Sequence, residues 1–180
     1  MRYNKDHKEI ARLRLLKSGG KHAKKHGFHE SGMAALASAA GVTTGALYKH
    51  FDDKSDLFAA LVHSELKQAA RKYEGVDAAG LKKALADYLS LHHVRHPEQG
   101  CPLPCLTPEI ARGPESVRSA FEAGLLEIHS TIQRSTGSSA SAWVLLAQTV
   151  GAVMLARAMQ NEAVQKDLLA AVRSVETIGR

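Results

Sequence analysis

The sequence predicts an all-α protein, with a small helix-turn-helix domain at the N-terminus and a larger helical bundle after it. Apolar residues recur at spacings of three and four, and no run of β-branched residues alternates over the length of a strand. The 180 residues are 44% hydrophobic and 23% charged, which is ordinary for a globular protein that builds its own core. We therefore expect a helical fold without a sheet.

Helix signals divide the chain into about nine predicted helices, with boundary errors of about two to four residues. They are expected at residues 6–26, 33–40, 44–50, 54–73, 78–95, 102–112, 114–134, 138–158 and 161–177. Gly27 follows a cationic last turn and is suited to end the first helix, and Ser31 is placed to cap the second. Pro97 and Gly100 end the fifth helix, and Pro114 suits the first turn of the seventh.

Two of the short helices form a compact hairpin in the stretch Ser31–Phe51, "SGMAALASAAGVTTGALYKHF". Small side chains in the first helix let the second cross closely, Gly41 turns the chain, and Thr43 can cap the second helix. Leu47 and Phe51 then turn inward, which leaves hydroxyl and cationic side chains on the outer face. Such side chains bind phosphates and base edges, and the helix is short enough to lie in a DNA major groove. The pattern favours a helix-turn-helix over a plain hairpin with a solvated face.

Positive charge is concentrated in the first 73 residues. They hold 14 Lys and Arg against 7 Asp and Glu, whereas the rest of the chain holds 10 against 11, so that the formal net charge is +6. A one-sided positive charge is what a polyanion-binding module needs, because each neutralised phosphate releases condensed counterions. Charge alone does not separate DNA binding from a solvated basic face.

The segment Gly27–Leu61 resembles the N-terminal signature of the TetR family of bacterial transcriptional regulators. A Gly-aromatic pair, the small-residue hairpin, the sequence LYKHF and a following Lys-x-x-Leu occur in register. The resemblance implies a DNA-binding domain at residues 1–53 and a ligand-binding and dimerisation domain at 54–180. It also implies a set of DNA contacts. These are Ser31, Thr43, Thr44, Gly45, Tyr48, Lys49, His50 and Lys54.

The first helix departs from that pattern at Gly19 and Gly20. Each glycine costs about 1 kcal/mol relative to alanine inside a helix. We therefore expect the first helix to be kinked or frayed near these residues.

The helix predicted at 138–158 is apolar nearly all round, and Ala147, Gly151 and Ala152 permit close approach. One side is expected to face its own domain and the other a second chain. The helix at 161–177 would complete a homodimeric bundle, as the resemblance also implies.

The candidate ligand-binding residues are aromatic or polar side chains within otherwise apolar helices. For each of them, packing in the hydrophobic core is the commoner role. They are Tyr88, His92, Phe121, Trp143 and Met154.

Cys101 and Cys105 are the two cysteines, and their spacing fits neither a disulfide framework nor a paired zinc motif. Nearby His92 and His96 make a metal site conceivable, but three prolines stiffen the link, and we expect no metal or other cofactor. Cys101 is predicted at the start of a helix, where the dipole stabilises a thiolate. A thiol- or metal-responsive regulator using Cys101 and His96 is therefore an alternative, with a packing role as the simpler explanation.

Several function classes lack support. The chain has no G-x-S-x-G, P-loop, G-x-G-x-x-G or H-E-x-x-H pattern, so we do not expect an enzyme. The N-terminus lacks an apolar signal segment and the longest apolar run is interrupted by polar residues, so we expect a cytoplasmic protein without a membrane span.

The sequence thus predicts a homodimeric repressor that binds a palindromic operator in double-stranded DNA and is released by a small-molecule inducer. The alternative is a helical module that binds DNA by charge alone, without reading its sequence.

Overall fold

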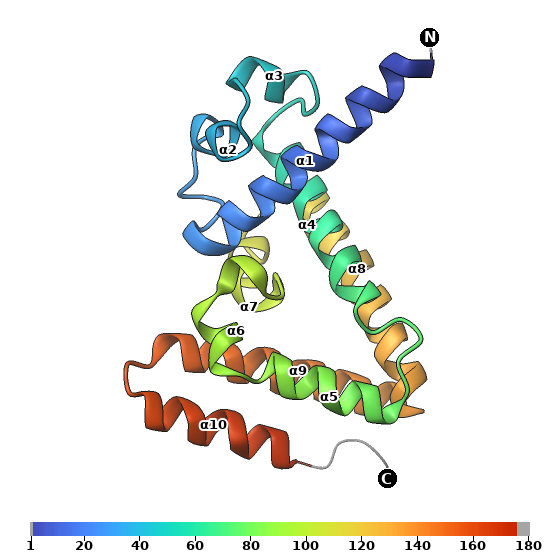
Figure 1. Cartoon of the computed structure of the whole chain (residues 1–180), viewed down its shortest axis with the longest axis vertical. Coiled ribbons are helices and arrows are strands. Elements are labelled where there is room, and N and C mark those ends of the chain that lie inside the picture. Colours follow the sequence, from blue (N-terminus) through green and yellow to red (C-terminus); the bar gives the residue numbers. More distant parts are fainter. Residues whose placement is uncertain (1, 176–180) are drawn as a thin grey trace.

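A computed structural model describes the backbone of residues 2–175 and the side chains of residues 9–175. Every regular element within that part is a helix, so the predicted all-α fold class is confirmed (Figure 1). The last two residues of the helix predicted at 161–177 lie outside the described residues. The elements are α1 (Arg2–His26), α2 (Met33–Ala39), α3 (Thr44–Tyr48), α4 (Lys54–Arg71), α5 (Ala78–Tyr88), α6 (Leu91–Arg95), the short 3₁₀ helix η1 (Pro97–Gln99), α7 (Leu103–Ile110), α8 (Glu115–Thr136), α9 (Ser139–Ala158) and α10 (Glu162–Ser174).

The first three helices form a head at one end of the molecule, and α4 leads from it to the other helices (Figure 1). α1 packs against α4 and α2, and α2 packs against α3. Phe28, just after α1, stacks on Phe58 of α4 with ring centroids 4.1 Å apart, and both rings are buried. Leu47 of α3 and the following Phe51 are buried in the same core. The head is therefore anchored on α4 by aromatic packing.

α4 and α8 run side by side in the same direction and form the long edge of the molecule in Figure 1. A Cβ added at Gly124 of α8 would lie 2.6 Å from the Cβ of Leu66 on α4, closer than side chains pack. Further along, Ser135 Oγ donates a hydrogen bond to the carbonyl oxygen of Val76 at 2.6 Å. Glycine at position 124 is what permits this close approach.

The fraying expected in the first helix does not occur, because α1 is continuous from Arg2 to His26. A Cβ added at Gly19 would lie 3.4 Å from Leu61 of α4, an ordinary contact, whereas one at Gly20 would overlap the carboxylate of Glu65. Both glycines are buried and lie where α1 crosses α4. Close tertiary packing therefore offsets the low helix propensity of glycine.

The single helix predicted at 78–95 is wrong, because the chain forms α5 and α6 with a break between them. Leu89 leaves the helical conformation with φ −87° and ψ 52°. Ser90 then adopts an extended backbone, and its hydroxyl oxygen accepts a hydrogen bond from the N–H of His93 at 3.2 Å. Serine is a favoured N-cap, and here its cap starts a new helix.

The cap predicted for the second helix is also wrong. Gly32 occupies the N-cap position of α2 without a side-chain bond. Ser31 is buried, and its hydroxyl donates to the carbonyl oxygen of Gly27 at 2.6 Å. Ser31 therefore closes the loop after α1 instead of capping α2.

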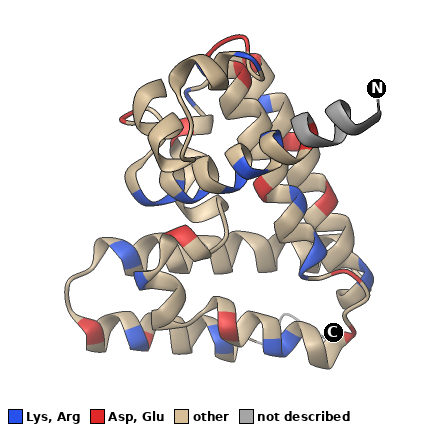
Figure 2. Ribbon diagram, turned by 45° about the horizontal axis from the view of Figure 1, so that its top comes forward, with Lys and Arg blue, Asp and Glu red and all other residues tan. Residues whose placement is uncertain are grey.

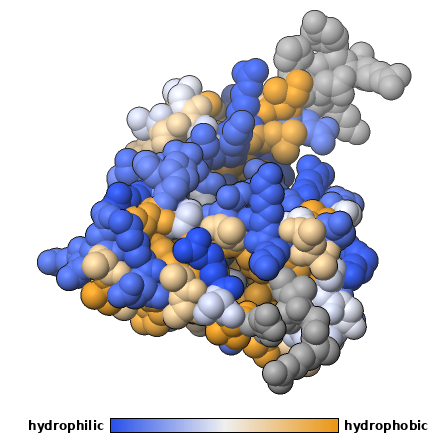
Figure 3. Space-filling view, turned by 60° about the horizontal axis from the view of Figure 1, so that its bottom comes forward, coloured by the Kyte–Doolittle hydropathy of each residue, from blue (hydrophilic) through white to orange (hydrophobic). Residues whose placement is uncertain are grey.

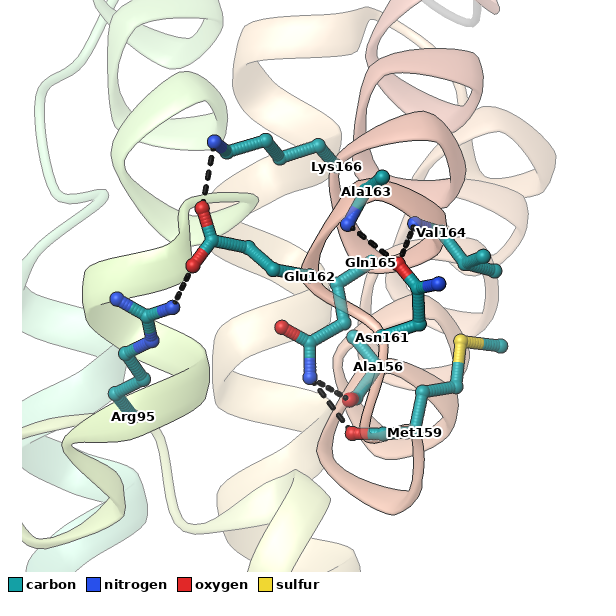
Figure 4. Close-up of polar contacts among 9 residues, drawn as sticks. All are labelled: Arg95, Ala156, Met159, Asn161, Glu162, Ala163, Val164, Gln165 and Lys166. Atoms are coloured by element: carbon teal, nitrogen blue, oxygen red, sulfur yellow. Dashed lines mark hydrogen bonds and ion pairs between the residues drawn. The ribbon is translucent and has the colours of Figure 1, made fainter.

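The lower end of the molecule is formed by α9 and α10, which are joined by a turn rich in polar contacts (Figure 4). Asn161 caps α10 by accepting hydrogen bonds from two backbone N–H groups at 2.9 and 3.4 Å. Buried Gln165 donates to the carbonyl oxygen of Ala156 at 3.0 Å, and Glu162 pairs with Arg95 of α6. These contacts fix α10 against α9 and α6.

α9 is the one helix within the described residues that is long and apolar enough, by length and composition, to cross a membrane. Its buried side packs against α6, α7, α8 and α10. These contacts explain the apolar residues on one side of α9 and leave apolar residues exposed on another.

Candidate nucleic-acid interface and junction pocket

α2 and α3 form the tight hairpin that the small residues and the capping threonine predicted. Gly41 has φ +70°, a left-handed conformation that glycine adopts without steric cost. Thr43 caps α3, since its Oγ1 accepts a hydrogen bond from the N–H of Ala46 at 3.2 Å. Leu47 is buried beneath α3. The local geometry therefore holds one face of α3 outward.

The residues predicted to contact DNA differ in exposure. Thr43, Gly45, Tyr48 and Lys49 are exposed, and Thr44 and His50 beside them are half-buried. The side chain of Tyr48 is among the exposed large hydrophobic groups of the chain, at 51%. The structure thus brings six of the eight predicted contacts together on and around α3.

The other two predicted contacts, Ser31 and Lys54, make hydrogen bonds to the loop between α1 and α2. The Ser31 hydroxyl is bonded to Gly27, as described above. Lys54 is half-buried, its Nζ donates to the carbonyl oxygen of His29 at 2.9 Å, and it lies 5.2 Å from the ring centroid of Phe28. Ser31 therefore closes the loop after α1, and Lys54 ties that loop to α4.

Basic side chains follow the outer face of α1. Arg14, Lys17, Lys21 and Lys25 are exposed at helical spacing, while Arg12 lies 5.0 Å from the ring centroid of Phe51. Figure 2 shows Lys and Arg along α1, whereas the lower helices carry both signs of charge. The positive charge predicted for the first part of the chain is therefore a surface feature of the head.

A cavity of about 450 Å³ opens where α1, α4, α5, α6 and η1 meet, and we call it the junction pocket. Its volume is typical of small-molecule sites. A second cavity, enclosed among the apolar residues of α4, α5, α8 and α9, has only about 20 Å³. Polar and titratable side chains in the junction pocket include Lys24, Glu65, Lys72, Asp87, Tyr88 and His92.

Lys24 brings the head into the wall of this pocket. Its Nζ lies 2.7 Å from Oε2 of Glu65 on α4, and both side chains are buried. The same ammonium donates to the carbonyl oxygen of Gly100 at 3.0 Å. One cation therefore joins α1, α4 and the segment after η1. Glu65 could have been noticed in the sequence, because it interrupts the apolar stripe of α4.

His93 forms part of the pocket floor and is held by two backbone groups. Its Nδ1 donates to the carbonyl oxygen of Tyr88 at 2.7 Å, and its Nε2 accepts from the N–H of Cys101 at 3.0 Å. Burial lowers the pKa of His93 to about 4, and the bond to Tyr88 only partly opposes this. His93 is therefore neutral at neutral pH. A Cβ at Gly100 would overlap the His93 ring, so glycine is needed beside it.

The residues predicted to bind ligand do not all lie at one cavity. Tyr88 and His92 line the junction pocket, whereas Phe121 packs against the core and Met154 is half-buried on α9. Trp143 is 40% exposed and stacks on His129 with ring centroids 4.1 Å apart. The structure brings two of these five residues together at one cavity.

The cysteines differ from the expectation of an activated thiol. α7 begins at Leu103, so Cys101 precedes the helix, and burial raises the pKa of its thiol more than the Leu103 backbone hydrogen bond lowers it. Burial also raises the pKa of Cys105, although Arg157 Nη1 donates to its Sγ at 2.8 Å. The predicted stabilisation of a Cys101 thiolate is therefore wrong, because desolvation outweighs the helix end.

His96 lies with its Nδ1 3.5 Å from a carboxylate oxygen of Glu98. Within the described residues, no group of three or more His, Cys, Asp or Glu side chains is arranged to hold a metal ion.

Comparison with known proteins places the head in a family. Residues 15–61 match the family model described as bacterial regulatory proteins, tetR family. The HTH-type transcriptional regulator TtgR of Pseudomonas putida is 30% identical over 91 residues, which cover 47% of this chain and 43% of TtgR. The HTH-type transcriptional repressor AcnR of Corynebacterium diphtheriae is 32% identical over 87 residues, which cover 48% and 44%. The match thus spans less than half the length of these curated relatives.

Solved structures extend the likeness to the whole fold. The reduced form of E. coli NemR superposes with a TM-score of 0.73 at 19% identity and covers 94% of this chain and 96% of that one. The regulatory protein TetR from Rhodobacter sphaeroides gives 0.69 at 20% identity, covering 91% and 95%. Residues 15–61, which contain the helix-turn-helix, thus carry the N-terminal domain of the tetR family of bacterial regulatory proteins, and the chain as a whole shares the fold of the solved regulators.

Proposed function

We propose that this chain is a DNA-binding transcriptional regulator, with residues 1–53 binding DNA and residues 54–180 binding an effector and a second chain. The carrying observation is the outward face of α3, which presents Thr43, Tyr48 and Lys49 to solvent while Leu47 packs beneath it. Hydroxyls and cations on a short exposed helix suit phosphates and base edges. The relatives named as a transcriptional regulator and a repressor support the same role.

The direct DNA contacts in this proposal are Thr43, Thr44, Gly45, Tyr48, Lys49 and His50. Ser31 and Lys54 act indirectly, because both are bonded to carbonyl oxygens of the loop that supports α2. The exposed cations of α1 add sequence-independent attraction to the phosphates.

A homodimer is proposed through α9 and α10. Trp143, Val144 and Leu155 of α9 and Val164 of α10 are each 40% or more exposed. Figure 3 looks onto this lower end, where hydrophobic surface lies between hydrophilic side chains. A Cβ at Gly151 would meet nothing within 4 Å, so a second helix has room to approach. A two-fold dimer places two α3 helices symmetrically, which requires a palindromic site.

We further propose that the regulator is a cytoplasmic repressor that leaves its operator when a small molecule occupies the junction pocket. The pocket has a suitable volume, and Lys24 of the head forms part of its wall. No catalytic role is proposed.

The test is selection of bound duplexes from a random DNA pool by the full chain at about physiological salt, where charge-only binding is weak. We expect recovery of a palindrome with two half-sites about one helical turn apart. A Tyr48→Ala variant should lose the enrichment, and Lys21→Ala, an exposed cation of α1, should retain it. Equal recovery of all sequences would refute the proposal and favour the module that binds by charge alone.

A further inference from the structure

The Tyr88 hydroxyl in the wall of the junction pocket lacks a proper partner. Its oxygen is buried and has no hydrogen-bond partner in the described residues. The Cys101 thiol is a polar neighbour, but thiols form only weak hydrogen bonds. Burial raises the pKa of Tyr88 well above its usual value, so its hydroxyl keeps its proton. A buried donor without an acceptor is costly and suits a pocket that receives an acceptor group from a ligand.

Positive charge around the pocket exceeds the free negative charge. Arg157 of α9 lies behind the pocket floor, and its Nη2 donates to the carbonyl oxygen of His93 at 2.8 Å. Neither Arg157 nor Lys72, which lines the pocket, has a carboxylate within salt-bridge distance among the described residues. Glu65 is already paired with Lys24, so Asp87 is the one remaining carboxylate in the lining. An occupant with a negative charge would therefore be favoured.

Lys24 connects this charge to the head. Its ammonium is shared between the Glu65 carboxylate and the carbonyl oxygen of Gly100. An anion in the pocket would compete with Glu65 for that ammonium. Glu65 has little room to withdraw, because its carboxylate lies against the backbone of α1 at Gly20. A change in the pair would therefore shift α1, which packs directly on α2.

Because the rings of Tyr73, Tyr88 and His92 line the junction pocket, we propose that it binds a small organic anion, a carboxylate on an aromatic body, and that Lys24 transmits its binding to the head. The carboxylate meets Lys24 and Lys72, and an acceptor on the ligand receives the Tyr88 hydroxyl proton in a hydrogen bond. The effect on α1 follows from a difference in ligand affinity between two arrangements of the Lys24 contacts. This inference rests on the proposed function, because it names the chemistry of the effector.

Binding is tested by calorimetry on the full chain without DNA. The probes are benzoate, 2-naphthoate and indole-3-acetate, each compared with its uncharged amide. We expect saturable binding of at least one acid, with one site per chain and at least tenfold tighter than its amide. Lys72→Met and Tyr88→Phe should each weaken binding severalfold, whereas Lys67→Met, an exposed cation of α4 outside the pocket lining, should not.

Absence of binding by all three acids, or equal binding of acid and amide, would overturn the site. If Lys72→Met and Lys67→Met changed the affinity for the acid equally, Lys72 would have no specific role in the pocket. If Tyr88→Phe bound the acid as tightly as the wild type, the Tyr88 hydroxyl would have no role in binding.

Transmission is tested by amide hydrogen exchange in residues 20–30. We expect the bound acid to speed exchange there in the wild type and to have no such effect in the double variant Lys24→Met, Glu65→Gln. Unchanged exchange in the wild type, measured with an acid that binds, would by itself remove Lys24 from the proposal, whether or not the double variant folds.

Neither measurement uses DNA, so the two proposals can fail separately. A chain that binds the acid but selects no palindrome would refute the proposed function and leave the site intact. A chain that selects a palindrome but binds none of the acids would refute the site alone.

Discussion

The ammonium of Lys24 on α1 lies 2.7 Å from the carboxylate of Glu65 on α4, and both side chains are buried. The same ammonium bonds to Gly100, 76 residues further along the chain. Burying two charges is costly unless each finds its partner, so this pair constrains where α1 can lie. The head is thus joined to the rest of the molecule by a specific charge contact in addition to apolar packing.

Removing only one of these charges should destabilise the protein strongly. Lys24→Met leaves the Glu65 carboxylate buried without a counter-charge, at a cost of about 3–5 kcal/mol in the free energy of unfolding. The double variant Lys24→Met, Glu65→Gln should lose much less, and exposed Lys21→Met should stay within about 0.5 kcal/mol of the wild type. Urea denaturation measures all three. A double variant as unstable as the single one would contradict the role assigned to the pair.

The two adjacent glycines of α1 should respond in opposite directions to alanine. Gly19→Ala makes only an ordinary contact with Leu61 and gains helix propensity, so we expect stabilisation of up to about 1 kcal/mol. Gly20→Ala would overlap the Glu65 carboxylate and should destabilise by about 1–3 kcal/mol. Thermal unfolding of the two variants compares them directly. Equal stabilisation by both would mean that α1 can move away from α4 without cost.

Stability should fall as the pH drops from about 6.5 to about 4 because of His93. Its pKa is lowered from 6.5 to about 4 in the folded state, so the unfolded chain takes up the proton first within this window. The contribution of neutral His93 to the free energy of unfolding is fully present above its pKa in the unfolded chain. It is lost as the pH falls through its pKa in the folded state. Each pKa unit corresponds to about 1.4 kcal/mol, so a pKa lowered from 6.5 to about 4 is worth on the order of 3–4 kcal/mol.

Urea denaturation across this pH range checks the assignment. His93→Gln should flatten the pH dependence, whereas His92→Gln, on the exposed side of α6, should keep it. Parallel pH curves for the wild type and His93→Gln would show that His93 is not the titrating group.

Variants of the α3 face should separate base readout from phosphate contact. Lys49→Ala is expected to weaken binding to all duplexes and to reduce the salt slope by about one, because it removes an exposed cation. Thr44→Ala should relax specificity at one base-pair position, at a cost of about 1–3 kcal/mol. Binding to the selected palindrome and its single-base variants at several salt concentrations measures both. Unchanged salt slope in Lys49→Ala would exclude a phosphate contact there.

Gly151→Arg should yield a folded monomer. An added side chain at this position meets nothing within 4 Å in a single chain, so the fold should survive, but a buried charge would disrupt a helix contact between chains. Sedimentation at micromolar concentration should show a wild-type dimer and a monomeric variant. Ala123→Arg, at an exposed position of α8, is the matched control and should remain dimeric. A monomeric wild type would contradict the dimer proposal.

The sequence by itself determined the helical class and the helix-turn-helix, because both depend on contacts between near neighbours. The spacing of apolar residues, the left-handed turn at Gly41 and the cap by Thr43 act within a few residues of the chain. The break at Ser90 is also local, but a lone serine within a helix-forming stretch is too weak a signal to find it.

The tertiary structure alone decided what the unusual residues do. Gly20 weakens an isolated helix, yet it is needed here because Glu65 lies against it, and Gly124 is needed because Leu66 does. Burial by distant segments raises the pKa of the Cys101 thiol, whereas the sequence predicted a stabilised thiolate. One wall of the junction pocket is likewise set by tertiary contacts, because Lys24 meets Glu65 and Gly100, which lie far along the chain. The spacing of residues in the sequence predicts which face of a helix each one occupies. It does not predict which other helix packs on that face, and the burial and pKa of a side chain depend on that packing.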